Sequence, residues 1–85
     1  MKYDYQKLYD DLSQLLATMV SFTPAERGEV QMFLDHNEYG LAFETICLII
    51  VEQHRSFPVE AIPSMRELAS RMKIESSYLE PIVNR

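Results

Sequence analysis

The spacing of apolar residues constrains this chain more than any other feature of its sequence. In the first segment, from about Tyr3 to Val20, they recur at the three- and four-residue spacing of one α-helical face. The residues on this face are Tyr5, Leu8, Tyr9, Leu12, Leu15, Leu16 and Met19. No segment alternates apolar and polar residues over more than a few positions, as a half-buried strand would. The sequence therefore predicts an all-α fold.

A strong signal for a helix start follows the first segment. Thr23 is suited to cap a helix, Pro24 fits its first position, and Glu26 has the capping-box spacing that lets it bond back to the cap. Val30, Phe33 and Leu34 would form the apolar stripe of this helix, which we expect to end near His36.

The third segment is predicted to be the central helix of the fold. We expect Asn37 to cap a helix that runs from Glu38 to about Arg55. Apolar residues occupy most of the circumference of this helix, which is typical of a buried helix. Gly40 in its first turn is expected to allow the close approach of another backbone.

The last third carries weaker signals. Met65, Leu68 and Met72 mark a helix over residues 63–73, and Ser77 and Glu80 have the spacing of a second capping box before a short final helix. With 85 residues, the chain is predicted to be one domain over residues 1–85, a compact bundle of four to five helices.

The charge and the single cysteine limit the classes of function. Eight Lys and Arg against thirteen Asp and Glu give a net charge of −5, which argues against direct binding of nucleic acid and permits a basic partner. One cysteine excludes an internal disulfide. The longest apolar run, Ile46 to Val51, is too short to span a membrane. We therefore expect a cytoplasmic protein.

No arrangement of residues predicts an enzyme. Cys47 lies in an apolar run and is expected to be a buried structural thiol. His36 and His54 lack the spacing of a metal-binding pair, and the polar residues around His36 are better explained as a helix junction. There is no glycine-rich phosphate loop. The sequence thus predicts no catalytic residue, no metal site and no cofactor.

Residues 64–80 carry an alternative interpretation, because they are similar to a helix-turn-helix. A DNA-reading helix would begin near Ser76 and should present Arg or Lys to the DNA. Here it offers Glu75 and Glu80 and is interrupted by Pro81. A small DNA-binding transcriptional regulator therefore remains the second hypothesis, beside that of a plain packing motif.

The centre of the chain, residues 33–47, reads FLDHNEYGLAFETIC. It resembles the signature of MafI-type immunity proteins, which, like the CdiI-type antitoxins, pair with toxins of bacterial competition that include contact-dependent growth inhibition systems. The family pattern Asn-Glu-aromatic-Gly-x-Ala-apolar-Glu is matched from Asn37 to Glu44, and its tail pattern Leu-Ala-x-x-Met-x-apolar from Leu68 to Ile74. The resemblance covers residues 23–80 of the chain.

This resemblance implies an all-α, non-enzymatic antitoxin that acts as a monomer in the cytoplasm by occluding the active site of its cognate toxin. Several toxins of this group are RNases, some of them similar to EndoU nucleases, so a basic nuclease domain is the expected partner.

An acidic inhibitor would be steered to such a site by charge. Folding roles for Asn37, Gly40, Ala42 and Phe43 would account for the central motif, which places the contact surface elsewhere. The predicted toxin-binding residues are Glu29, Asp35, Glu38, Glu52 and Tyr39, with Tyr3 and Tyr5 as further aromatic anchors.

Overall fold

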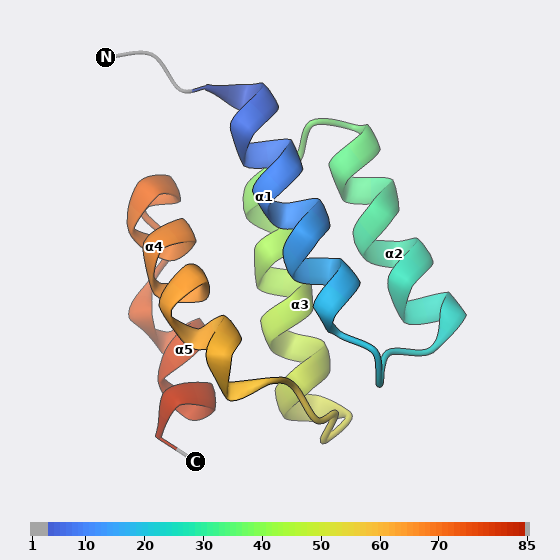
Figure 1. Ribbon diagram of the computed structural model, residues 1–85, viewed down its shortest axis with the longest axis vertical. Helices are drawn as coiled ribbons and strands as arrows, with labels where there is room; N and C mark the ends of the chain where they lie inside the picture. The colour runs from blue at the N-terminus through green and yellow to red at the C-terminus, as the bar shows by residue number, and fades with distance from the viewer. Residues whose placement is uncertain (1–3, 85) are drawn as a thin grey trace.

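The computed structural model describes residues 4–84, and all regular structure in this range is helical (Figure 1). The elements are α1 (Tyr5–Thr18), α2 (Pro24–Asp35), α3 (Tyr39–Glu52), the short 3₁₀ turn η1 (Val59–Ala61), α4 (Ile62–Met72) and α5 (Ser76–Val83). This confirms the predicted all-α bundle of four to five helices.

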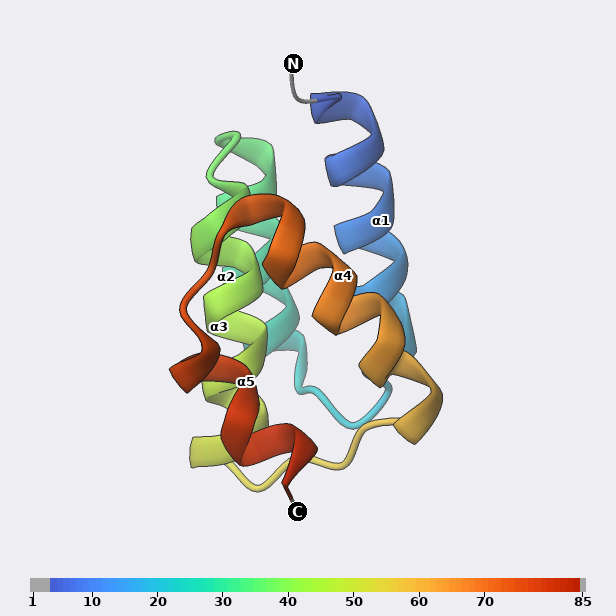
Figure 2. The same ribbon diagram turned by 90° about the vertical axis from the view of Figure 1, so that its left-hand side faces the viewer.

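The first three helices run down, up and down beside one another, and the last two cover one side of them (Figure 1). α2 and α3 form an antiparallel hairpin, α4 crosses obliquely next to α1, and α5 packs against α3 and α4 (Figure 2). All five α-helices contribute to one buried apolar cluster, with Phe43 and Ile46 of α3 fully enclosed. The described part of the chain measures 35 × 26 × 19 Å. No helix in it is both long and apolar enough to cross a membrane.

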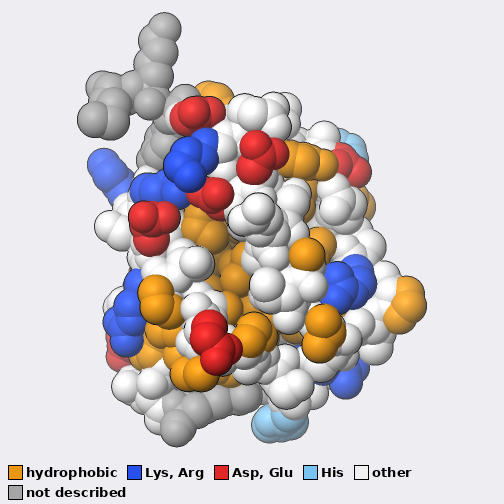
Figure 3. Space-filling view, viewed as in Figure 1, with side chains coloured by type: hydrophobic (Ala, Val, Ile, Leu, Met, Phe, Trp, Pro, Cys, Tyr) orange, Lys and Arg blue, Asp and Glu red, His pale blue; other side chains and the backbone are white. Residues whose placement is uncertain are grey.

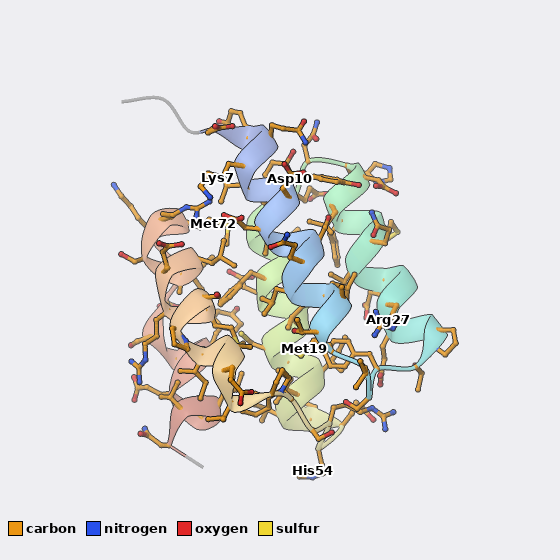
Figure 4. All side chains as sticks on the ribbon, viewed as in Figure 1. Lys7, Asp10, Met19, Arg27, His54 and Met72 are labelled. Carbon is orange, nitrogen blue, oxygen red and sulfur yellow. The ribbon has the colours of Figure 1, made fainter. Side chains whose placement is uncertain are left out.

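The ends of α1 are fixed by two side chains that bond to its free backbone groups. The carboxylate of Asp4 accepts a hydrogen bond from the backbone N–H of Lys7 at 3.0 Å and so caps the first turn. At the other end, the guanidinium of Arg27 in α2 donates to the carbonyl oxygens of Leu16 and Met19 (3.2 and 2.6 Å; Figure 4). The helix therefore ends at Thr18, slightly short of the predicted end.

The capping box predicted at the start of α2 is confirmed. The Thr23 hydroxyl accepts from the Glu26 backbone N–H at 3.1 Å, and the Glu26 carboxylate accepts from the Thr23 backbone N–H at 2.8 Å. The same carboxylate also holds Arg55 in a forked ion pair, with Nη2 3.0 Å from Oε2. The hydrogen bond from Arg55 is the main reason why the pKa of Glu26 is lowered. One carboxylate thus joins the start of α2 to the segment that follows α3.

The predicted role of Asn37 as the cap of α3 is wrong. Asn37 has a φ of 60°, in the left-handed region, and it closes α2 instead. Its backbone N–H donates to the Leu34 carbonyl (3.1 Å), and the N–H of Glu38 donates to the Phe33 carbonyl (2.8 Å), which is the Schellman pattern. The capping position of α3 is taken by Glu38, whose side chain makes no capping hydrogen bond.

Two further helix ends use a left-handed residue in the same way. His54 (φ 52°) follows α3 at the lower tip of the molecule (Figure 4), and Lys73 (φ 55°) follows α4. Neither glycine of the chain has a positive φ, and both lie inside helices: Gly28 in α2 and Gly40 in α3.

Two local predictions about packing and capping are also wrong. Beside Gly40 lies the side chain of Ile74, whose Cδ1 would be 3.7 Å from an added Cβ, and not another backbone. The second capping box does not form, because α5 begins at Ser76 with Glu75 as its cap and no side-chain capping bond. The short final helix is present, and it buries Leu79 and Ile82.

Candidate functional site

The α2–α3 hairpin is the most unequal in charge of all parts of the molecule. Between residues 28 and 54 the sequence contains five acids and no Lys or Arg. The cations that border this stretch are both engaged within the fold: Arg27 with the end of α1, and Arg55 with Glu26. No ion pair is formed within residues 4–84 by the five acids, which are Glu29, Asp35, Glu38, Glu44 and Glu52. The hairpin therefore presents uncompensated negative charge.

The structure brings two of the predicted toxin-binding acids to the same groove. Glu29 from α2 and Glu52 from α3 both line a shallow groove of about 220 Å³ between these helices, together with Thr45, Leu48 and Ile49. Glu29 and Glu52 are exposed, whereas Ile49 is buried at its floor. An apolar floor with carboxylates on both sides suits a partner that carries both apolar and basic groups.

The other two predicted acids lie at the opposite end of the hairpin, at the turn between α2 and α3. The Asp35 carboxylate accepts hydrogen bonds from the Gln31 side-chain amide at 2.9 Å and from the Tyr9 hydroxyl at 3.4 Å. Glu38 is exposed beside it. The four acids are thus two separate pairs, so they do not form one continuous patch.

The predicted aromatic anchors are brought together near this turn. The ring of Tyr39 stacks on that of Tyr5, with the ring centroids 6.1 Å apart. The Tyr39 hydroxyl donates to the Asn37 side-chain oxygen at 3.0 Å. The Tyr39 hydroxyl therefore helps to hold the left-handed turn at Asn37 and has a role in the fold itself. The side chain is half-buried. Tyr3 lies outside the described residues.

Two leucines on the outer side of α3 are not buried as the sequence predicts. Leu41 and Leu48 were expected to extend the buried circumference of α3, but their exposed fractions are 44% and 42%. The signal that identifies them is their spacing of seven residues, which keeps both on one face together with Thr45 and Glu52. A helix in a molecule this small cannot be covered on all sides, and this is the side left open.

Cys47 is a buried thiol, and His36 contacts the backbone of the helix that it ends. Cys47 is buried in the core, and burial raises the pKa of its thiol to about 12, with a smaller contribution from Glu44. The thiol therefore stays protonated at neutral pH, where a nucleophile would need the thiolate. Nδ1 of His36 lies 2.7 Å from the Met32 carbonyl. Within residues 4–84 no three His, Cys, Asp or Glu side chains converge as metal ligands would.

The helix-turn-helix hypothesis predicts a basic outer face on α5, and the described helix does not offer one. α4 and α5 do form a helix pair with a tight turn at Lys73. However, the exposed residues of α5 are Ser76, Ser77, Glu80 and Pro81, and none can contact a phosphate through a positive charge. The pair instead buries Leu68, Leu79 and Ile82 in the common core.

Comparison with protein-family models, with curated proteins and with solved structures returns no match to this chain.

Proposed function

We propose that this protein is an immunity protein, an antitoxin that binds a basic nuclease toxin and covers its active site. The observation that most supports this is the stretch of the α2–α3 hairpin from residue 28 to residue 54, which contains five acids and no Lys or Arg. These five acids form no ion pair with the described residues. The motif that resembles MafI-type immunity proteins spans the same hairpin.

A nuclease must hold a polyanion, so its active site collects Lys and Arg. An acidic protein is drawn to such a site over several ångströms, and the attraction raises the association rate. In the cytoplasm, at an ionic strength near 0.15 M, this attraction acts within about 8 Å. The acids of the hairpin would compete with RNA for the same cations, which is the physical basis of inhibition by occlusion.

Cells that carry an immunity protein express it with its toxin, so the two genes should be neighbours. The proposal is tested by producing this protein together with the toxin domain encoded immediately upstream, and by measuring complex formation and RNA cleavage. We expect a stable complex that co-purifies and a toxin whose RNase activity is suppressed in proportion to the complex formed.

The same assay contains its control. A toxin domain from an unrelated system, also a basic nuclease, should remain active in the presence of this protein, because immunity requires shape matching in addition to charge. If the cognate toxin domain neither binds this protein nor loses activity with it, the proposed function is wrong.

A further inference from the structure

The outer side of α3 carries a strip of residues that no part of the described chain covers. Leu41, Thr45, Leu48 and Glu52 recur at the spacing that places them on one helical face. We call these four residues the α3 ridge. Its two leucines are each more than two fifths exposed, whereas the neighbouring Phe43 and Ile46 on the inner side are not exposed at all. The ridge is thus an unpartnered apolar strip beside a fully packed core.

Carboxylates frame the apolar strip. Glu52 lies on the ridge, Glu44 is one turn from Leu48 on the same helix, and Glu29 faces it across the α2–α3 groove. An apolar contact surrounded by acids is complementary to apolar side chains surrounded by Lys and Arg, because exclusion of water at the centre strengthens the ion pairs at the rim.

We propose that the α3 ridge, with the adjoining α2–α3 groove, binds a basic amphipathic segment of the toxin surface. Only the identity of the partner rests on the proposed function; the chemistry of the occupant follows from the ridge itself. Leu41 and Leu48 are about 10 Å apart along the helix axis, from a rise of about 1.5 Å per residue. The segment therefore places apolar side chains over these two leucines and its cations against Glu29, Glu44 and Glu52.

One other groove and one other occupant of the ridge fit less well. The groove between α1 and α4 is larger, about 350 Å³, but most of the charges at its rim are paired within the fold: Asp11 pairs with Lys7 and Arg71, and Arg71 also pairs with Glu67. Figure 3 shows blue and red side chains mixed over this upper part of the face. A second copy of the chain on the ridge would bring carboxylates against carboxylates, which opposes self-association.

The first test removes the apolar part of the ridge. A Leu41→Ser, Leu48→Ser double variant should weaken toxin binding by about tenfold or more, as expected for anchors at the centre of an interface. The matched control is Val20→Ser with Val59→Ser, since both valines are exposed (83% and 67%) and lie outside the ridge. The control should bind as wild type does, and melting temperatures of both variants confirm that they are folded.

The second test needs no toxin. A short amphipathic helical peptide of Leu and Lys, and a counterpart in which Glu replaces Lys, are titrated into the isotope-labelled protein. Amide shifts read by NMR should change around residues 41–52 and at Glu29 with the Lys peptide, and not with the Glu peptide. In the Leu41→Ser, Leu48→Ser variant, the shift changes caused by the Lys peptide should be lost both around residues 41–52 and at Glu29.

The two tests separate the proposal from the proposed function. A toxin that binds with unchanged affinity to the ridge variant, together with peptide shifts elsewhere on the protein, overturns the ridge and leaves the immunity function standing. A toxin that does not bind wild type, with peptide shifts on the ridge, supports the ridge and rejects the function. Peptide shifts centred on Asp4, Asp10 or the α1–α4 groove overturn the ridge in either case.

Discussion

The α2–α3 and α4–α5 hairpins share one backbone device and differ in the use of their charges. Each turn has a left-handed residue, Asn37 or Lys73, and the same pair of backbone bonds closes the helix before it. In residues 62–84 three Lys and Arg balance three Glu, whereas residues 28–54 contain acids alone. Arg71 of α4 bonds to Asp11 of α1, so charge in the second hairpin helps to hold the fold. The acids of residues 28–54 form no ion pair with the described residues, although Asp35 accepts hydrogen bonds from Tyr9 and Gln31. Their negative charge is therefore available for a partner.

The largest expected effect is a loss of stability, which compares how much each hairpin contributes to the buried core. Phe43 in α3 is completely enclosed, whereas Leu79 in α5 is 8% exposed. Phe43→Ala should lower the free energy of unfolding by about 3–5 kcal/mol, and Leu79→Ala by about 2–3 kcal/mol, since the cavity left near the surface collapses more easily. Urea denaturation measures both. Equal losses at the two positions would show that α5 is as central as α3.

The next prediction reverses the charge of each hairpin in turn. Glu29→Lys and Glu52→Lys should each weaken toxin binding, and together by about tenfold or more, about 1.4 kcal/mol. Glu75→Lys and Glu80→Lys in the second hairpin are the matched controls and should leave the affinity unchanged. Wild-type binding should also weaken as salt is added, because exposed charges are screened. Equal effects of both pairs would mean that only net charge matters, and would contradict a specific acidic face.

The comparison also explains which parts of the structure could be predicted from the sequence. Helical spacing predicted all five α-helices, and the Thr23 capping box was predicted because it is local: both partners lie within one turn. Asn37 was misassigned because Asn is favoured both at a helix start and in the left-handed conformation at a helix end, and only the tertiary fold decides between them. Lys73 carries no local signal for a left-handed residue at all.

For the candidate site residues, too, the sequence predicts what is local and not what depends on the tertiary fold. The sequence gives the number of acids but not their partners, so it could not tell that Glu26 is engaged by Arg55 whereas Glu29 is not. It could not separate Leu41 and Leu48 from the buried residues of α3, because helix α5 covers one side of α3 and leaves another open. Burial by a distant segment is not encoded in the periodicity of the helix it covers.

A smaller effect tests the turns themselves. A left-handed conformation costs a non-glycine residue about 1–2 kcal/mol, and glycine avoids this cost while losing more chain entropy on folding. Lys73→Gly should therefore raise the free energy of unfolding by up to about 1 kcal/mol. Asn37→Gly should gain less stability or lose some, because Asn tolerates this conformation and its side-chain oxygen accepts a hydrogen bond from the Tyr39 hydroxyl. Thermal denaturation compares the two variants, and an equal gain in both would show that the Tyr39 bond contributes nothing.

Replacing the two helical glycines should also raise stability, by a similar or smaller amount. Gly28 has open space beside it, so Gly28→Ala is expected to raise stability by up to about 1 kcal/mol through helix propensity. Gly40→Ala should give a smaller gain, because Gly40 lies in the first turn of α3 and its new methyl group would only touch Ile74, at 3.7 Å. A loss of stability in Gly40→Ala would mean that the two hairpins pack more closely at this point than the structure describes.

The smallest expected effect concerns the ion pair that joins the second hairpin to α1. The hydrogen bond from Arg71 is the largest cause that lowers the pKa of Asp11 below its ordinary value of 3.8, with Lys7 adding to it and burial opposing it. A carboxylate with a lowered pKa stabilises the folded state above its ordinary pKa, and this stabilisation is lost as the pH falls below 3.8 toward the lowered value.

Asp11→Asn should therefore be slightly less stable than wild type at neutral pH and should lose less stability between neutral pH and strong acid. Because Asp11 is partly exposed, screening by solvent keeps both changes small. Arg71→Met should produce a smaller flattening in the same direction, and the double variant should lose less than the sum of the two single variants, since both remove the Asp11–Arg71 pair. Urea denaturation at a series of pH values measures the curve. If the stability of Asp11→Asn falls in acid as steeply as that of wild type, the charges of the second hairpin contribute no more to folding than the unpaired acids of residues 28–54. The contrast between the two hairpins then does not hold.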